Sequence, residues 1–210
     1  MKSYIMEFIG TMFLVLAIGL TQDPLAIGIM LTAIIYAGGH ISGAHYNPAI
    51  TIAIWMRGKL ATKYVAGYIL MQILGAFVAA ALCYYMAEKT FVPNLGEGIT
   101  VSQAIIAEII FTFLLAMVIL NVATSSKLEG NYIYGLAIGF TVTASAFCVG
   151  GISGAVLNPA VGLSFVLVGK IINSGISIEQ LYIYLTAPFV GGILAFLAFR
   201  FLNSEEFTSD

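Results

Sequence analysis

Long apolar runs separated by short polar segments dominate the chain. A helix that crosses a bilayer needs about 20 predominantly apolar residues, within a range of roughly 17–25, and six runs fall within that range. The pattern therefore predicts six membrane spans, at residues 4–20, 25–42, 62–86, 101–123, 131–149 and 179–202.

Two further segments are apolar but do not fit a full span. Residues 43–58 and 154–170 each open with glycine and contain Asn-Pro. A helix from Asn47 to Arg57 has 11 residues, and its counterpart from Asn158 has 12. At 1.5 Å per residue each helix is roughly 16–18 Å long, about half the ~30 Å hydrocarbon layer. The two segments are therefore predicted to be half-helices that enter the membrane and return.

An internal repeat organises these segments. Residues 39–50 and 150–161 are identical at eight of twelve positions, at an offset of 111. Each half holds three spans, an odd number, so the second half enters from the opposite side of the membrane. The expected fold class is an all-α membrane protein with six transmembrane helices and two re-entrant half-helices. It forms a single domain over 1–210, with inverted repeats of about 1–99 and 100–210.

Composition excludes several classes of protein. Hydrophobic residues make up 60% of the chain and charged residues 9%, against about 25% charged in soluble domains. The formal net charge is −2 without a basic cluster, which argues against nucleic-acid binding. The two cysteines are too few for a disulfide framework or a zinc site. No nucleophile–base set is visible, so the chain is not expected to be an enzyme, and no cofactor or metal is expected.

The distribution of basic residues predicts the orientation. With six spans both termini face the same side, and the side richer in Lys and Arg is cytoplasmic. If the N-terminus is cytoplasmic, the segments on the cytoplasmic side contain six Lys and Arg residues and those on the outer side contain two. We therefore expect a multi-pass protein of the cell (inner) membrane with both termini cytoplasmic. The inner group is Lys2, Arg57, Lys59, Lys63, Lys127 and Arg200, and the outer group is Lys89 and Lys170.

The repeated Asn-Pro-Ala motif predicts a polar centre within the membrane. Asparagine caps helix N-termini and proline favours the first helical position, so each motif marks a helix start. The amide NH2 groups are expected to stay free and to point into a lumen. The two facing N-termini carry partial positive charge, which favours neutral solutes and repels cations. The motif residues are Asn47, Pro48 and Ala49, with Asn158, Pro159 and Ala160.

The residues before each asparagine are expected to be non-helical. Irregular backbone at membrane depth survives where it lines a wet cavity or is buried in protein, so their carbonyls should form a ladder of acceptors along a pore. His45 could instead mainly hold its own loop in place. The ladder residues are Gly43, Ala44, His45, Gly154 and Val156, with Ala155 between the last two.

These features resemble the aquaporin superfamily, also called the major intrinsic proteins. The marks are Ser-Gly-Ala-His-x-Asn-Pro-Ala at 42–49, Asn-Pro-Ala at 158–160, and span-initial Glu7 and Glu108. The resemblance covers nearly the whole chain and implies a homotetramer with one pore per subunit, in contact with membrane lipid. It also implies that the two glutamates are structural buried acids that accept hydrogen bonds from the re-entrant loops. A proton-coupled transporter would use such acids differently.

Several positions depart from the patterns found in the family. Most members have an arginine directly after the second Asn-Pro-Ala, where this chain has Val161. Counting without gaps from the two asparagines gives Ile27, Ala146 and Ala155 as the other selectivity-filter positions. Glycerol-conducting members usually have an aspartate at the next position, which is Gly162 here. At these positions of the family's filter this chain has small or apolar residues, which implies a wide and apolar filter.

We interpret the chain as a passive channel for small neutral solutes: water and larger uncharged molecules such as glycerol, urea or undissociated metalloid acids. The alternatives are a strict water channel, a secondary transporter of inverted-repeat type, and a closed structural membrane protein. Two segments are expected to have no further role. They are the outer loop at Pro93–Gly98 and a solvated acidic tail with Glu205, Glu206 and Asp210.

Overall fold

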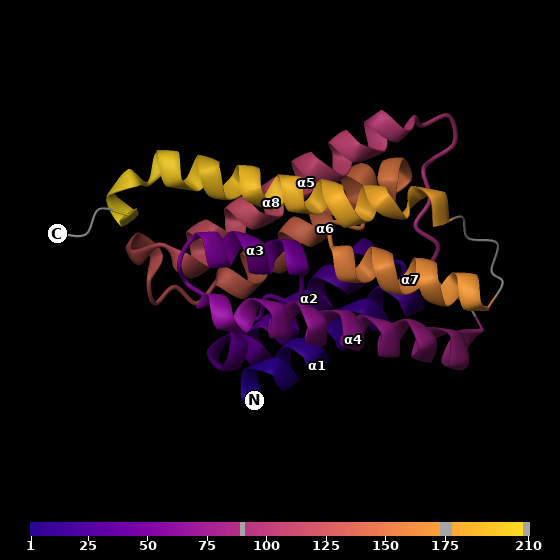
Figure 1. Ribbon diagram of the computed structural model, residues 1–210, viewed down its shortest axis with the longest axis horizontal. Helices are drawn as coiled ribbons and strands as arrows, with labels where there is room; N and C mark the ends of the chain where they lie inside the picture. Colours follow the sequence, from indigo (N-terminus) through magenta and orange to yellow (C-terminus); the bar gives the residue numbers. More distant parts are fainter. Residues whose placement is uncertain (89–90, 173–177, 208–210) are drawn as a thin grey trace.

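The computed structural model describes residues 1–88, 91–172 and 178–207, and within these it contains helices and no strand (Figure 1). Lys89, which counts in the charge comparison, lies outside them. The long helices are α1 (Lys2–Thr21), α2 (Pro24–Ser42), α4 (Thr62–Ala87), α5 (Val101–Thr124), α6 (Tyr134–Ser153) and α8 (Leu181–Leu202). The shorter ones are α3 (Pro48–Met56), α7 (Pro159–Ile171) and the 3₁₀ turns η1 (Ser126–Leu128), η2 (Ile178–Gln180) and η3 (Ser204–Phe207).

The six long helices are long and apolar enough to cross a membrane. The helices α3 and α7 have 9 and 13 residues, so each reaches only part of the way through a ~30 Å layer. Both begin at the proline that follows the repeated asparagine. The predicted all-α membrane fold of six spans and two short helices is confirmed.

One predicted span is displaced along the chain. The apolar pattern placed it at 131–149, but α6 runs from Tyr134 to Ser153. It starts late because the Asn131 side chain donates to the Val122 carbonyl, at 2.8 Å, and stays in the preceding turn. It ends late because the glycine pair before Ser153 remains helical, and Gly154 (φ 83°) forms the left-handed cap.

The two short helices lie end to end in the middle of the molecule, and they point their N-termini at each other (Figure 1). The start of α1 and the end of α8 lie toward the same end of the bundle (Figure 1), which we call the termini end; the other is the far end. Helix α1 packs on α4 as α5 packs on α8, and α3 contacts α8 as α7 contacts α4. These paired contacts support the inverted repeat, which stays a prediction.

Two glycines at corresponding places allow close helix contacts. A Cβ atom at Gly75 in α4 would lie 2.3 Å from the Phe8 carbonyl oxygen of α1. A Cβ atom at Gly191 in α8 would lie 2.5 Å from the Ile109 carbonyl oxygen of α5. Small residues at such crossings let backbones approach in lipid, where packing rather than the hydrophobic effect drives helix association.

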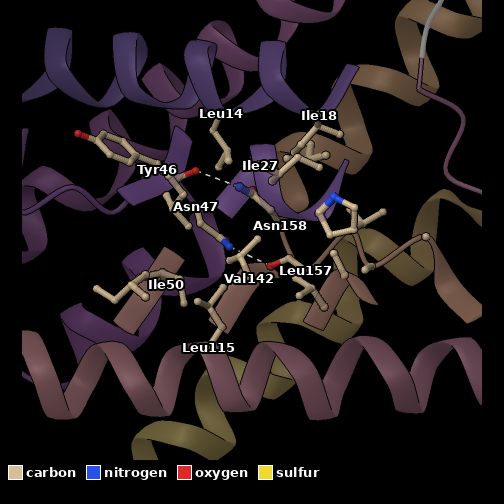
Figure 2. A pocket seen from close by; sticks show the side chains of 18 of the residues that line it. Leu14, Ile18, Ile27, Tyr46, Asn47, Ile50, Leu115, Val142, Leu157 and Asn158 are labelled. Atoms are coloured by element: carbon tan, nitrogen blue, oxygen red, sulfur yellow. Dashed lines mark hydrogen bonds between the residues drawn. The ribbon is translucent and has the colours of Figure 1, made fainter. Parts of the chain in front are cut away.

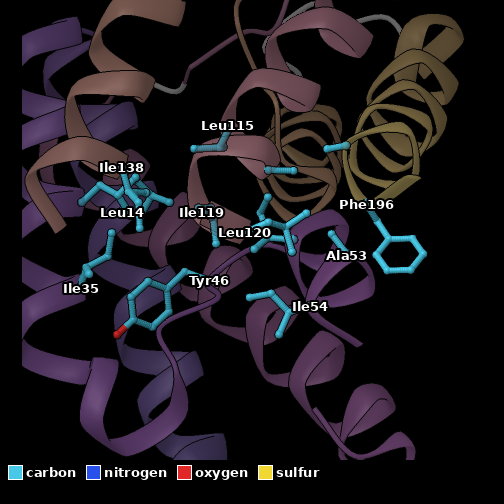
Figure 3. Packing of buried hydrophobic residues seen from close by; sticks show 14 of the residues in the cluster. Leu14, Ile35, Tyr46, Ala53, Ile54, Leu115, Ile119, Leu120, Ile138 and Phe196 are labelled. Atoms are coloured by element: carbon cyan, nitrogen blue, oxygen red, sulfur yellow. The ribbon is translucent and has the colours of Figure 1, made fainter. Parts of the chain in front are cut away.

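A cluster of buried apolar side chains surrounds α3 and the loop before it (Figure 3). Tyr46 belongs to this cluster and has no exposed surface. The Tyr46 hydroxyl donates to the Ile34 carbonyl at 2.9 Å, and its ring fills the space beside Gly10 of α1. This one side chain therefore anchors the first re-entrant loop to both α1 and α2.

The acidic tail is not solvated throughout, so that expectation is wrong for Glu206. Its side chain is only 6% exposed, and the Arg57 guanidinium at the end of α3 donates to it at 2.6 Å. Glu205, by contrast, pairs with Lys127 at the surface. Asp210 lies outside the described residues. The tail thus closes over the end of the first half-helix.

Replacement of Glu206 by glutamine is expected to lower the unfolding temperature in a pH-dependent way. The hydrogen bond from Ser125, with others from Ser126 and the charge of Arg57, lowers the pKa of Glu206 from 4.5 to about 2. A lowered pKa means that the carboxylate stabilises the fold fully above pH 4.5 and stops doing so as the pH falls to about 2. The difference between the wild type and Glu206→Gln should therefore narrow over this range.

Circular dichroism of the detergent-solubilised protein during heating, at several pH values, measures this difference. The matched control is Glu205→Gln, which breaks an exposed pair and should change the unfolding temperature little. A Glu206→Gln effect of constant size between pH 7 and pH 2 would show that the charge of Glu206 is not what holds the tail.

Candidate functional site: the central cavity

The two asparagines cap the short helices with their own side chains. Asn47 Oδ1 accepts from the Ala49 backbone N–H at 2.9 Å, and Asn158 Oδ1 accepts from the Ala160 N–H at 3.0 Å. Both asparagines have extended backbones, and the proline after each has no N–H to leave unpaired. The local sequence alone thus accounts for both helix starts.

The amide NH2 groups join the two halves (Figure 2). Asn47 Nδ2 donates to the Leu157 carbonyl at 2.8 Å, and Asn158 Nδ2 donates to the Tyr46 carbonyl at 2.9 Å. The expectation that these groups stay free is therefore wrong for one N–H of each. An amide NH2 group has two N–H donors, so each asparagine keeps one for a solute.

The loops before the asparagines have an unusual backbone. Their first two residues and the residue just before the asparagine have φ between 47° and 85° in both halves. A left-handed conformation costs a residue other than glycine about 1–2 kcal/mol, so other contacts must hold these loops. The residues are Gly43, Ala44 and Tyr46, with Gly154, Ala155 and Leu157.

Glu7 supplies those contacts in the first half. One carboxylate oxygen accepts from the Ser42 hydroxyl at 2.7 Å and the His45 backbone N–H at 3.0 Å. The other accepts from the Tyr46 N–H at 2.7 Å and the Gln72 amide at 2.8 Å. Four donors therefore converge on one fully buried carboxylate, which holds the loop with its N–H groups turned away from the cavity.

Glu108 makes the equivalent contacts in the second half. Its carboxylate accepts from the Ser153 hydroxyl at 2.6 Å, the Val156 N–H at 2.9 Å and the Leu157 N–H at 2.6 Å. Neither Glu7 nor Glu108 lines the central cavity. The geometry therefore supports a structural role for both acids and gives no support to a proton-coupling role.

His45 both links its own loop to α3 and lines the cavity, the two roles expected for it. Its ring nitrogen Nδ1 lies 3.2 Å from the Thr51 hydroxyl, which also accepts from the Gln72 amide at 2.8 Å. The ring packs against Tyr68 with centroids 5.1 Å apart. The residue nonetheless lines the cavity. The second half has Val156 at this place, so the histidine network belongs to the first half.

The cavity has a volume of about 250 Å³, and the asparagine pair is part of its lining (Figure 2). Its polar lining consists of the two asparagines, Gln22 at the end of α1, and the two loops. In these loops the carbonyls of 43–45 and 154–156 accept no hydrogen bond from any described residue. Of these residues Gly43 lines a second cavity toward the termini end, and the others line the first. The long helices contribute an apolar wall of Leu14, Ile18, Ile27, Leu31, Ile35, Leu115, Ile119, Ile138, Val142 and Ala146.

All four predicted filter positions border this cavity. Val161 lies in the first turn of α7, with Ala155 in the loop before it, Ile27 on α2 and Ala146 on α6. Among the described residues that line the cavity, none is Asp, Glu, Lys or Arg. No group of three or more potential metal ligands occurs in the described part of the chain. The site can therefore offer a solute hydrogen bonds and apolar contact, but no formal charge.

Sequence reasoning missed Phe91, which also lines the cavity. It belongs to the segment that joins the halves, and its ring packs edge-to-face on Phe165 of α7 with centroids 5.3 Å apart. The Gly96 N–H donates to the Ile152 carbonyl at 3.1 Å and docks the segment on α6. The expectation that Pro93–Gly98 is the outer loop between the halves stays a prediction, and the Gly96 contact adds that this loop packs on α6. No motif marks an aromatic residue in a connection as pore-lining, so the sequence offered no signal.

The chain resembles known proteins over nearly its whole length. The sequence model of the major intrinsic protein family matches residues 1–199. The "Glycerol uptake facilitator protein-like 6" of Lactiplantibacillus plantarum is 35% identical over 98% of this chain and 100% of its own length. "Aquaporin AqpM" of Methanothermobacter marburgensis is 37% identical over 86% of this chain and 76% of its own length.

A solved structure has the same fold. It is the aquaglyceroporin from Plasmodium falciparum, which matches with a TM-score of 0.86 over 99% of both chains. The sequence identity is 23%, so this similarity concerns the fold alone.

Proposed function

Because this chain belongs to the major intrinsic protein family, we propose that it is a passive channel with a wide, apolar filter. Members of this family are channels and not enzymes, and this chain is a membrane channel for water and small solutes. The solutes we assign to it are water and larger uncharged molecules, such as glycerol, urea and undissociated metalloid acids. The name of the Lactiplantibacillus plantarum relative, a glycerol facilitator-like protein, supports glycerol in this range.

The observation that carries the proposal is the small size of the filter side chains. Val161, where most family members have arginine, presents an isopropyl group, and its cavity neighbours Ala146 and Ala155 present methyl groups. A guanidinium, an imidazole or an aromatic ring at these places would narrow the passage. None of the four positions holds one, so these positions leave more width for a solute than the usual side chains would.

The centre of the cavity selects for neutral solutes. The positive ends of α3 and α7 face each other, each with the equivalent of roughly half a charge, and each asparagine has one N–H to offer. The loop carbonyls provide acceptors on both sides of this point. A polyol or a hydroxy acid can exchange its hydration for these groups, whereas a cation meets an unfavourable potential.

Two alternatives fit the geometry less well. A strict water channel would need a narrow polar filter, and the four filter positions are apolar. A secondary transporter would need a coupling-ion site at the cavity, but Glu7 and Glu108 are turned toward the loop backbones instead. We further propose that both termini are cytoplasmic, that the far end is the outer mouth, and that four subunits assemble with one pore each.

Stopped-flow light scattering on proteoliposomes tests the proposed solute range. Water, urea, glycerol and arsenous acid form a graded set, with protein-free liposomes as the control. Flux of glycerol and arsenous acid well above the control is expected. Water flux alone would mean that another group fills the space beside Val161, and the wide-filter proposal would fail.

A further inference from the structure

Two cavities follow one another along the passage, and the boundary between them lies away from the four filter positions. The first cavity contains all four filter residues together with Asn47 and Asn158. A second cavity, of about 310 Å³, lies toward the termini end and is lined by His40, Gly43 and Tyr134 among others. The wall between these two spaces lies on the route that a solute takes from the asparagine pair to the termini end.

Four residues line both cavities and so form that wall. They are Ile35 of α2, Ile119 of α5, Ile138 of α6 and Ala44 of the first re-entrant loop. No comparable partition separates the filter positions from the asparagines, because a single cavity contains both. The far end is thus continuous with the centre, while the termini end is set apart by an apolar ring.

The three isoleucines are held firmly in place. Their exposed fractions are 3%, 8% and 6% for Ile35, Ile119 and Ile138. All three belong to the buried cluster around Tyr46, and Figure 3 shows them on three different helices. A β-branched side chain has few rotamers within a helix, so the ring cannot open by small adjustments of a flexible side chain.

The chemistry of the ring differs from that of the rest of the passage. Isoleucine side chains offer no hydrogen bond, so a solute at this wall can replace lost hydration only at the Ala44 carbonyl. Apolar constrictions of this kind control passage through their width and through the cost of wetting them. At the asparagine pair, by contrast, N–H groups and carbonyls replace the lost water.

We propose that the ring of Ile35, Ile119 and Ile138, rather than the mouth that contains Val161, limits the size of the solutes that pass. This inference rests on the proposed function as a channel and names the site that sets its upper size limit. It makes three isoleucines on α2, α5 and α6 the specificity-determining residues of the passage.

A matched pair of neighbours on α2 provides the test. Ile35→Ala shortens a ring residue, whereas Ile34→Ala shortens an isoleucine of the same buried cluster that lines neither cavity. In proteoliposomes, Ile35→Ala should raise the flux of erythritol relative to water by roughly tenfold, as expected when about 1.4 kcal/mol is removed from a barrier. Ile34→Ala should leave that ratio at the wild-type value.

Val161→Ala is the comparison variant at the far mouth, where it shortens a filter side chain. The gain in erythritol flux should be larger for Ile35→Ala than for Val161→Ala. An equal or larger gain for Val161→Ala, or no gain for Ile35→Ala, would overturn the inference. If Ile35→Ala does not yield a monodisperse protein, Ile119→Val and Ile138→Val remove one methyl group each. The ratio of erythritol flux to water flux in these variants then tests the inference.

The failure of this inference can be distinguished from failure of the proposed function. If the wild type passes water but not glycerol, the wide-filter proposal fails. The inference still stands in that case if Ile35→Ala admits glycerol and Ile34→Ala does not. If the wild type passes glycerol and only changes at Val161 alter the size limit, the proposed function stands and the isoleucine ring does not.

Discussion

Replacement of Glu108 by glutamine is expected to destabilise the protein strongly and to abolish solute flux. The carboxylate accepts three hydrogen bonds, from Ser153, Val156 and Leu157. A glutamine side chain keeps one acceptor oxygen and turns the other into a donor, so at least one of these donors faces an N–H group. Leaving a buried donor unpaired costs about 1–3 kcal/mol, and losing the charge weakens the remaining bonds.

That loss is large against a typical stability of 5–15 kcal/mol. It also acts on a loop whose left-handed residues, Ala155 and Leu157, cost free energy of their own. Once the loop relaxes, the Leu157 carbonyl no longer accepts from Asn47. The second half-helix would then lose one of its two hydrogen bonds to the first half, which leaves only the bond from Asn158 to the Tyr46 carbonyl, and we expect the passage between them to close.

The measurement combines thermal unfolding in detergent with glycerol and water flux in proteoliposomes. The matched control is Glu97→Gln, an exposed glutamate of the connecting segment, which should change neither. A Glu108→Gln protein with wild-type unfolding temperature and flux would show that the carboxylate does not organise the loop. A variant with wild-type stability but without flux would instead assign the acid to transport chemistry.

Replacement of Val161 by arginine is expected to reduce glycerol flux at least roughly tenfold, an increase of about 1.4 kcal/mol in the barrier, and to reduce water flux much less. The new side chain starts from the first turn of α7 and faces the cavity that Ile27 and Ala155 also line. A guanidinium there occupies width and holds hydration water through its five donors. The far mouth would then become narrower than the isoleucine ring and take over the size limit.

Val161→Met separates bulk from charge, since it adds length without a donor. If width alone matters, methionine should reduce glycerol flux in part, and arginine should reduce it further. Equal glycerol-to-water ratios in wild type, Val161→Met and Val161→Arg would show that this position does not border the constricted part of the mouth. Size-exclusion chromatography of each variant establishes that the protein tested is folded.

The sequence determined the elements of this protein because their causes are local. Runs of apolar residues long enough for a bilayer mark the six spans. Asn47-Pro48 and Asn158-Pro159 mark two helix starts because a cap and a missing N–H act within one turn. The repeat of these signals placed the half-helices in opposite halves, and the residue types at Ile27, Ala155 and Val161 already indicated an apolar filter.

Only the tertiary structure decided which distant groups meet. It joined each asparagine amide to the carbonyl before the other asparagine and brought Glu206 to Arg57, 149 residues away. It placed Phe91 at the cavity and three isoleucines from separate helices around one narrowing. An isoleucine in an apolar span has the same local sequence signal whether it faces lipid, a core or a lumen. The helix contacts choose among these surroundings, and they depend on segments far apart in the chain.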